Sequence, residues 1–401
     1  MSLQSAHSDQ KHPSVTAAAA LRPRLEQRIA LGDEIRRLPD DTIADLKDAG
    51  LLAALIPAQH GGSEVTLDIL FDIVQELGQA DGSVAWTYAV LAAGSWMAAG
   101  FFSAAASRQL YGSANPSTGA VMTPSKLSAE QVDGGMLIHE AQWSFNSGIH
   151  HAGWNVIGIP TFGAHGEPVD LLIGLVPTEQ LTIVDDWDTS GLRGSGSCTT
   201  VAKDLFVPSE RLASYNNLLK DQFPEDRASG APLYSMAVAP AVVVRFAAPA
   251  IAIARGALNK FLQQAPNRRI KLTVYIDQSA AAVTHLQVAE AAAKIDAAET
   301  ITRRSMAELE AAAAKGQHLT VEQRARIWRD ASFASHLAWE ATDLLASASG
   351  GSFIRTSNPI NHAWRDLRAL TAHAALNLTT AFEAFGRVRF GLPSNNPMLP
   401  A

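Results

Sequence analysis

The sequence is poor in cysteine and in charged residues. Cys198 is the one cysteine among 401 residues, which excludes a disulfide within the chain and leads us to expect a reducing, cytoplasmic setting. Charged residues make up 18% of the chain and the net charge is -7, without any block of Lys and Arg. This pattern gives no support to nucleic-acid binding. The first twenty residues lack a basic start followed by an apolar core, so we expect a frayed end and no secretory signal.

One long stretch lacks charge altogether. No charged residue stands between Asp81 and Arg108, and residues 84–106 are mostly apolar, which is long enough to span a bilayer. The stretch is rich in Ala, Gly and Ser, however, and no cluster of Lys or Arg flanks it. We therefore expect a buried helix hairpin and no membrane contact, while a membrane-associated helical scaffold remains an alternative.

Hydrophobic patterning divides the chain into three parts. Residues 21–111 have the spacing of helices, whereas residues 116–211 alternate short apolar runs with Gly, Pro and Asp clusters, as strands do. Four long helical segments then follow, at 234–264, 283–314, 321–347 and 363–386. The predicted fold is α+β and mostly α: an N-terminal helical domain (20–115), a central β-barrel or sandwich domain (116–212) and a C-terminal four-helix bundle (213–401).

The last helical segment carries a histidine. Residues three or four apart share a helix face, so Asp366, Leu370, His373 and Asn377 are expected to form one stripe. His373 is then either a hydrogen-bonded core residue or a group that moves protons at a buried site.

The order of these parts, and several short motifs, resemble the acyl-CoA dehydrogenase fold over most of the chain. Two motifs, Asp81-Gly-Ser-Val-Ala-Trp86 and Trp143-Ser-Phe-Asn-Ser-Gly148, are similar to the flavin monooxygenases built on this fold (group D) more than to the dehydrogenases. The glycine-rich run 191–197 and the pair Arg365-Asp366 are further landmarks. Neither neighbourhood in which the dehydrogenases carry a catalytic carboxylate has one here, at Val242–Ala248 or at Ala372–Ala375.

The resemblance implies two catalytic residues, His373 and Ser147, beside the flavin ring. The flavin contacts that it implies in the central domain are Trp143, Phe145, Asn146, Ser147 and Ser197. Strand alternation puts Trp143, Phe145 and Ser147 on one face, although an ordinary half-buried strand would show the same pattern. The 191–197 run is either a loop near the flavin or substrate, or a plain β turn.

Further positions follow from the resemblance and stay open in detail. Arg268 or Arg269 is expected to contact the flavin pyrophosphate of a neighbouring subunit, near Gly350 and Gly351. The guesses for the substrate pocket are Trp86, Trp96, Met122 and Phe353. No metal site is expected: His150 and His151 would point to opposite faces of a strand, and Cys198 has no evident His partner.

The function implied is that of the oxygenase component of a two-component flavin monooxygenase. A separate flavin reductase would supply reduced FAD or FMN, and O2 would form a flavin hydroperoxide that hydroxylates an aromatic or heteroaromatic substrate such as a phenol or indole. We expect a homotetramer, since an Ala stripe at residues 289, 292, 293 and 297 permits close helix contact. The alternative is an acyl-CoA dehydrogenase or oxidase with a displaced base.

Overall fold

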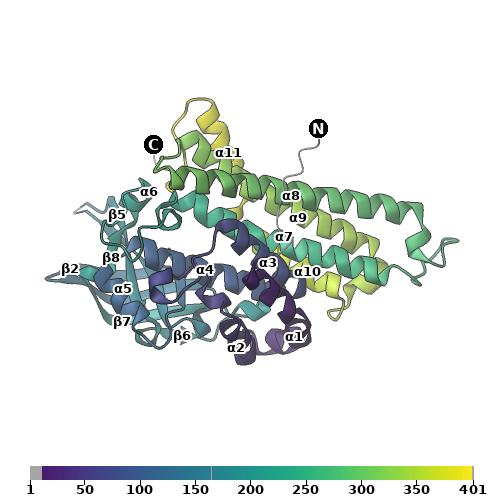
Figure 1. Ribbon diagram of the computed structural model, residues 1–401, viewed down its shortest axis with the longest axis horizontal. Coiled ribbons are helices and arrows are strands. Elements are labelled where there is room, and N and C mark those ends of the chain that lie inside the picture. The colour runs from purple at the N-terminus through teal and green to yellow at the C-terminus, as the bar shows by residue number, and fades with distance from the viewer. Residues whose placement is uncertain (1–10, 164, 400–401) are drawn as a thin grey trace.

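The computed structural model describes residues 11–163 and 165–399, and the chain folds in the predicted order of helices, strands and helices (Figure 1). The N-terminal helices are α1 (Pro13–Ile35), α2 (Asp40–Asp48), α3 (Leu67–Ala80), α4 (Gly82–Phe101) and α5 (Ala104–Tyr111). Helix α1 begins at Pro13, a residue that suits the first turn of a helix because its missing N–H needs no partner there. The expected frayed end is therefore wrong for residues 13–20, while residues 1–10 lie outside the described chain.

The charge-free stretch forms the long helix α4 and the start of the short helix α5, so the expected hairpin of two buried helices within residues 84–106 is wrong. The Asp81 carboxylate accepts a hydrogen bond from the Ser83 N–H and so caps α4. Every residue of α4 is buried in the fold. Helix α4 and α7 (Val238–Gln264) are both long and apolar enough to cross a membrane by composition, but their most apolar windows are 100% and 89% buried. Burial against the rest of the chain accounts for their composition.

The strands form two four-stranded sheets packed on one another. Their bounds are β1 (Thr118–Val121), β2 (Lys126–Val132), β3 (Gly135–Asn146), β4 (Trp154–Phe162), β5 (Pro168–Pro177), β6 (Thr182–Val184), β7 (Cys198–Pro208) and β8 (Leu212–Ser214). One sheet has the order β1-β4-β5-β8 and the other β2-β3-β7-β6. Side chains of both sheets meet in a separate apolar core that includes Ile138, Trp143, Ile157 and Val207. The short helix α6 (Tyr215–Leu219) follows the last strand.

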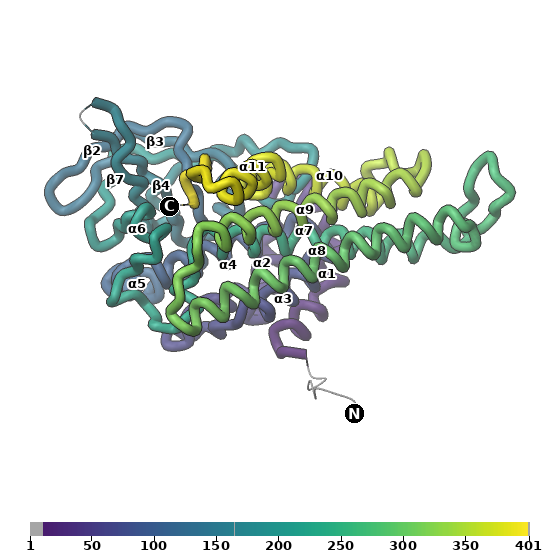
Figure 2. Tube along the Cα trace, turned by 90° about the horizontal axis from the view of Figure 1, so that it is seen from above, coloured from purple at the N-terminus to yellow at the C-terminus, as the bar shows by residue number. Residues whose placement is uncertain are grey.

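The bundle consists of α7, α8 (Ala282–Ala314), α9 (Val321–Ala348) and a last helix that is broken in two (Figure 2). We predicted one helix over 363–386, but α10 (Pro359–Thr371) ends before His373 and α11 (Leu378–Arg389) begins after Asn377. The Asn377 side chain accepts from the Thr380 N–H and caps α11, while His373 has extended backbone angles. The His373 side chain thus caps the start of a short 3-10 turn after α10, Asn377 caps the start of α11, and the expected four-residue stripe does not form.

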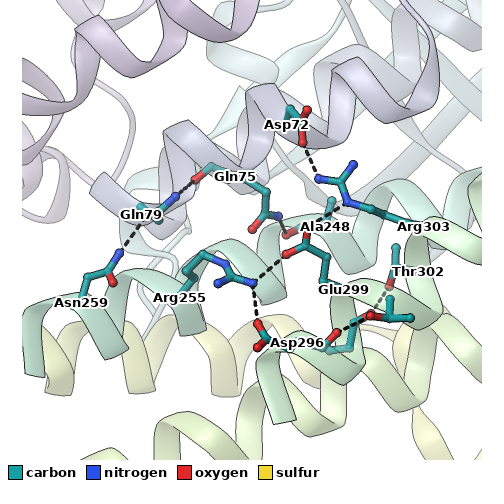
Figure 3. Close-up of polar contacts among 12 residues, drawn as sticks. Asp72, Gln75, Gln79, Ala248, Arg255, Asn259, Asp296, Glu299, Thr302 and Arg303 are labelled. Carbon is teal, nitrogen blue, oxygen red and sulfur yellow. Dashed lines mark hydrogen bonds and ion pairs between the residues drawn. The ribbon is translucent and has the colours of Figure 1, made fainter. Parts of the chain in front are cut away.

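Helix α3 joins the N-terminal helices to the bundle through a polar seam (Figure 3). Gln75 donates to the backbone carbonyl of Ala248 on α7 over 3.0 Å. Arg303 of α8 pairs with Asp72 of α3 and with Glu299, which in turn accepts from Arg255 of α7. These contacts hold α3 against α7 and α8, and α4, the next helix in the chain, packs against both α3 and α7.

Candidate active site

Three buried serine hydroxyls form a continuous hydrogen-bonded chain at the junction of the β domain with α4. The Oγ atoms of Ser147 and Ser197 lie 2.7 Å apart, and those of Ser197 and Ser195 lie 2.8 Å apart. The Trp86 Nε1–H donates to Ser147 Oγ over 3.0 Å. All four side chains are at most 6% exposed. A hydroxyl both donates and accepts, so this chain of serines can bind the polar edge of a ligand. Its hydroxyl groups can rotate when the protonation of that ligand changes.

Two aromatic rings, those of Phe246 and His373, pack against the side of Trp86 that faces away from the serine chain. The ring centroids of Trp86, Phe246 and His373 are 5.1, 5.3 and 5.4 Å from one another in pairs, with tilted or edge-to-face geometry. Trp86 comes from α4, Phe246 from α7 and His373 from the break between α10 and α11. We call these three residues the aromatic triangle. The break in the last helix therefore places His373 against Trp86, the residue that donates to Ser147.

The state of His373 follows from its surroundings. Its Nδ1 accepts a hydrogen bond from the Ala375 N–H at 3.2 Å and caps the 3-10 turn η10 (Ala374–Leu376). That bond leaves the proton of the neutral ring on Nε2. Part of the residue reaches the surface, but the ring itself packs against two aromatics, and burial lowers the pKa of His373 to about 4. At neutral pH His373 is thus an uncharged donor at Nε2.

A β-bulge overturns the expected alternation of residues 143, 145 and 147. The register of β3 with β7 shifts between Trp143 and Asn146, and Phe145 takes a positive φ of 65°. Trp143 is fully buried and donates from Nε1 to the Gly158 carbonyl inside the β core, whereas Phe145 is 72% exposed. Asn146 is buried and donates to Thr200 Oγ1 at 3.1 Å. Of the five flavin contacts expected in the central domain, the structure brings together Ser147 and Ser197, with Asn146 beside them in the chain.

The second expected flavin region gathers at the far end of α10. Arg268 donates from Nη2 to Ser352 Oγ at 2.8 Å and passes close to Gly350, which has a positive φ of 56°. Arg269 is exposed, and nothing lies within 4 Å of the Cβ position of Gly351. Helix α10 has thirteen residues, so this region and the aromatic triangle are about 20 Å apart along its axis.

The pocket guesses are scattered over the fold. Trp86 belongs to the aromatic triangle, but Trp96 donates to the Leu233 carbonyl and packs under the Arg245 guanidinium. Met122 is half-buried beyond β1, and Phe353 packs edge-on against Trp364 near the Arg268 end of α10. The structure therefore leaves only Trp86 of these four beside Ser147 and His373.

Two other features lie outside this constellation. Cys198 does have a histidine neighbour, since His150 Nε2 is 3.4 Å from its Sγ, which corrects our expectation. Burial raises the pKa of the thiol, so it stays protonated. Hollows of about 100 and 630 Å³ lie at the turn between α8 and α9, lined by residues such as His318 and Leu319. They contain no member of the serine chain or the triangle, and we place the site by its chemistry.

Comparison with known proteins decides the family. The N-terminal and C-terminal domain models of acyl-CoA dehydrogenase match residues 8–110 and 244–378. The oxygenase subunit HsaA of a flavin-dependent monooxygenase from Rhodococcus jostii is 30% identical over 381 residues, with 95% of this chain and 99% of the relative covered. The chain belongs to the flavin-dependent monooxygenases of the acyl-CoA dehydrogenase fold. The predicted fold and family are thereby confirmed.

Two further proteins are similar over nearly the whole chain. The oxygenase component of the FADH(2)-dependent resorcinol hydroxylase from Rhizobium sp. is 30% identical, with 90% of each chain covered. The solved structure of XiaF from Streptomyces sp., in complex with FADH2 and glycerol, superposes with a TM-score of 0.88 at 28% identity and covers 97% of this chain and 96% of its own.

The residues present fit a flavin. An isoalloxazine ring needs an apolar wall and a few polar contacts, which the triangle and the serine chain supply. Thr87, next to Trp86, also buries its hydroxyl without a partner among the described residues, while its methyl group lies near Gly148, whose φ is 72°. Sequence reasoning missed Phe246 and Ser195. Phe246 could have been noticed as the aromatic in the run 242–248, which is otherwise aliphatic apart from Arg245, whereas nothing in the sequence singles out Ser195 among its neighbours.

Proposed function

We propose that this chain is the oxygenase component that uses reduced flavin and O2 to hydroxylate a phenol- or indole-like substrate at the site formed by the serine chain and the aromatic triangle. The observation that carries the proposal is the uncharged His373, which lies against the tryptophan that donates to Ser147. The chain belongs to a family of enzymes with this chemistry, and a separate flavin reductase is the expected source of the reduced cofactor.

Reduced flavin, when bound, supplies the two electrons by which one oxygen atom of O2 enters the substrate and the other leaves as water. The Ser147 hydroxyl, fixed by Trp86 and Ser197, presents either a hydrogen or a lone pair to the reacting edge. His373 keeps its N–H at Nε2 and can donate a hydrogen bond from it as an uncharged ring. Trp86 and Phe246 keep water away from both groups, which limits loss of reducing power as hydrogen peroxide.

The substrate proposed is a small aromatic compound with an electron-donating group. Relatives include the resorcinol hydroxylase and, at 26% identity, an indole-3-acetate monooxygenase from Acinetobacter baumannii. The aromatic triangle supports this class because stacked and edge-on rings bind planar aromatics well. FAD and FMN both remain candidates for the cofactor.

The assembly proposed is a homotetramer in a cytoplasmic setting. Ala289, Ala293 and Ala297 form an exposed stripe on α8, and small side chains permit a second helix to approach closely. The separation of about 20 Å along α10 supports a role for Arg268 and Gly350 toward the flavin of a neighbouring subunit. We also retain the domain limits 20–115, 116–212 and 213–401. Strands β1 to β7 lie within the second range, whereas β8 (Leu212–Ser214) pairs with β5 and extends that sheet two residues past its limit.

The test supplies the protein with reduced FAD or FMN from a generic flavin reductase under 18O2 and screens phenols, indoles and an acyl-CoA. We expect a hydroxylated aromatic product that carries one labelled oxygen atom. Absence of product from every aromatic compound, together with bleaching of bound oxidised flavin by the acyl-CoA, would replace the proposal with the dehydrogenase alternative.

A further inference from the structure

A second buried histidine, His362, lies between carboxylates that come from distant parts of the chain. Its Nε2 is 3.3 Å from a carboxylate oxygen of Asp33 on α1, and its Nδ1 is 3.3 Å from Oδ2 of Asp366, one turn further along α10. Asp81, the cap of α4, is the third acid that acts on the ring. Three segments separated by up to about 330 residues therefore meet at one imidazole.

The charges around His362 are arranged to keep it protonated. Burial works against the charged ring, but Asp366, Asp33 and Asp81 outweigh it and raise the pKa of His362 to about 9. Asp366 is fully buried, and burial raises its pKa although His362 and a backbone N–H oppose that shift. The cations nearby are Arg365 and Arg193, which act on the same acids. The imidazolium is thus the cation closest to the buried Asp366 carboxylate.

Asp366 and its neighbour hold one specific segment of backbone, residues 190–197, which we call the serine loop. Asp366 Oδ1 accepts from the Leu192 N–H at 2.7 Å, and Arg365 Nη1 donates to the Ser190 carbonyl at 2.6 Å. A Cβ at Gly191 would meet the Arg365 carbonyl oxygen at 2.0 Å, so only glycine permits this approach. The serine loop is therefore pressed against the same turn of α10 that carries the imidazolium's partner.

The serine loop ends in the hydroxyls of the proposed active site. Ser195 and Ser197 belong to it, and their hydrogen bonds reach Ser147. Arg193 of the same loop donates to the backbone carbonyl of Asp33, the outer partner of His362. Ser195 and Ser197 follow Leu192 by only three and five residues. If the loop moved at Leu192, both serines would move with it, and the Ser147 hydroxyl that they hold would move as well.

We propose that His362 is a positioning residue of the oxygenation reaction: as an imidazolium clamped between Asp33 and Asp366, it fixes the serine loop and thereby the orientation of the Ser147 hydroxyl. The proposal rests on the proposed function for its effect on turnover, but its effect on the serine loop stands without it. His362 has no contact with the aromatic triangle among the interactions of the described residues, so it acts through Asp366 and the loop.

The first experiment measures loop mobility without flavin. His362→Gln keeps a hydrogen-bonding side chain of similar size and removes the charge, and hydrogen exchange is followed at the amides of residues 190–197. We expect exchange at least about tenfold faster than in the parent, since the Leu192 N–H loses a firmly placed acceptor. His139→Gln is the matched control, because His139 pairs with Glu130 at 3.0 Å on the exposed face of β3. Exchange that is equally slow in parent and His362→Gln would overturn the proposal.

The second experiment measures the ratio of product to hydrogen peroxide in parent, His362→Gln, Ser197→Ala and the double variant. We expect each single change to lower the product-to-peroxide ratio at least about fivefold. The ratio of the double variant should equal that of the more affected single variant, because His362 and Ser197 act through the same serine loop. The parent ratio should also fall as the pH rises through about 9, whereas that of His362→Gln should not show this step. The proposal fails if the losses in ratio of the two single variants multiply in the double variant. It also fails if His362→Gln is less stable than the parent but keeps the parent ratio, since His362 would then have only a structural role.

Two arms keep the outcomes separate. If His362→Gln does not fold, Asp33→Asn takes its place, because it leaves the contact of His362 with Asp366 intact. This variant should show the same changes with smaller amplitude. Unchanged hydrogen exchange of its serine loop would contradict the proposed role of His362. If Ser147→Ala retains the parent ratio, the proposed role of Ser147 fails, while the exchange measurement still decides whether His362 holds the serine loop.

Discussion

His362 and His373 stand eleven positions apart, both largely buried, and their charge states are opposite. His373 has aromatic neighbours and a backbone N–H, and burial lowers its pKa to about 4. His362 has Asp33, Asp81 and Asp366 around it, and its pKa is raised to about 9. The comparison teaches that burial alone makes an imidazole neutral and that only carboxylates at short range reverse this. In our proposals the neutral ring serves the reacting site and the charged ring holds the serine loop beside it.

The largest effect is expected for His373→Ala. Loss of the Nε2 donor should reduce product formation by about two to four orders of magnitude, while reduced flavin is still consumed and hydrogen peroxide appears instead. Because Nδ1 caps η10, we also expect a loss of about 1 kcal/mol of folding stability. Product, peroxide and melting temperature are measured on one preparation, and a destabilised variant with parental coupling would assign His373 to the core alone.

The second effect concerns the pH dependence of stability. The folded pKa of His362 lies above the ordinary value of 6.5, so its contribution is fully present below pH 6.5 and is lost as pH rises through about 9. Chemical denaturation should show the parent losing up to about 3 kcal/mol relative to His362→Gln over this interval. Parallel stability curves for the two proteins would mean that His362 is uncharged in the fold. His373 acts in the opposite sense, since stability is lost as pH falls from 6.5 toward 4.

A third effect tests the distant end of α10. Arg268→Ala should weaken binding of reduced flavin by about 10- to 100-fold, as expected for loss of a charge-assisted hydrogen bond. Arg269→Ala is the control and should change affinity less than twofold, because Arg269 is exposed. Equal losses in both variants would point to general electrostatic attraction and would remove the specific role of Arg268.

The smallest effect is expected for Trp86→Phe. This change keeps a ring in the aromatic triangle and removes the Nε1–H that Ser147 accepts. Loss of about 1 kcal/mol of hydrogen bonding should lower the product-to-peroxide ratio about fivefold. Trp364→Phe removes a comparable bond to Asp343 on the exposed side of α10 and should leave the ratio unchanged. A ratio that is the same in both variants would show that Trp86 contributes only its ring.

The order of helices, strands and bundle was predictable because hydrophobic periodicity is local. The break at His373 was not, since a run of Ala on both sides favours a helix and the caps at His373 and Asn377 act against that preference. The bulge at Phe145 likewise reverses an alternation that reads as regular strand. The acids around His362 could not be predicted, because Asp33 reaches the ring, and Asp81 acts on its charge, only through tertiary packing. The i,i+4 spacing of His362 and Asp366 was the single local signal.

Direct titration of the two imidazoles tests the central claim that His373 is neutral and His362 is charged in the folded protein at neutral pH. Histidine is labelled at Cε1 in the intact protein, and its carbon and proton shifts are followed by NMR from pH 5 to 10. The signals are assigned by their loss in His362→Gln and His373→Gln. We expect the His373 signal to stay at the neutral position throughout and the His362 signal to stay protonated until about pH 9. Two signals that both titrate near pH 6.5 would contradict the account.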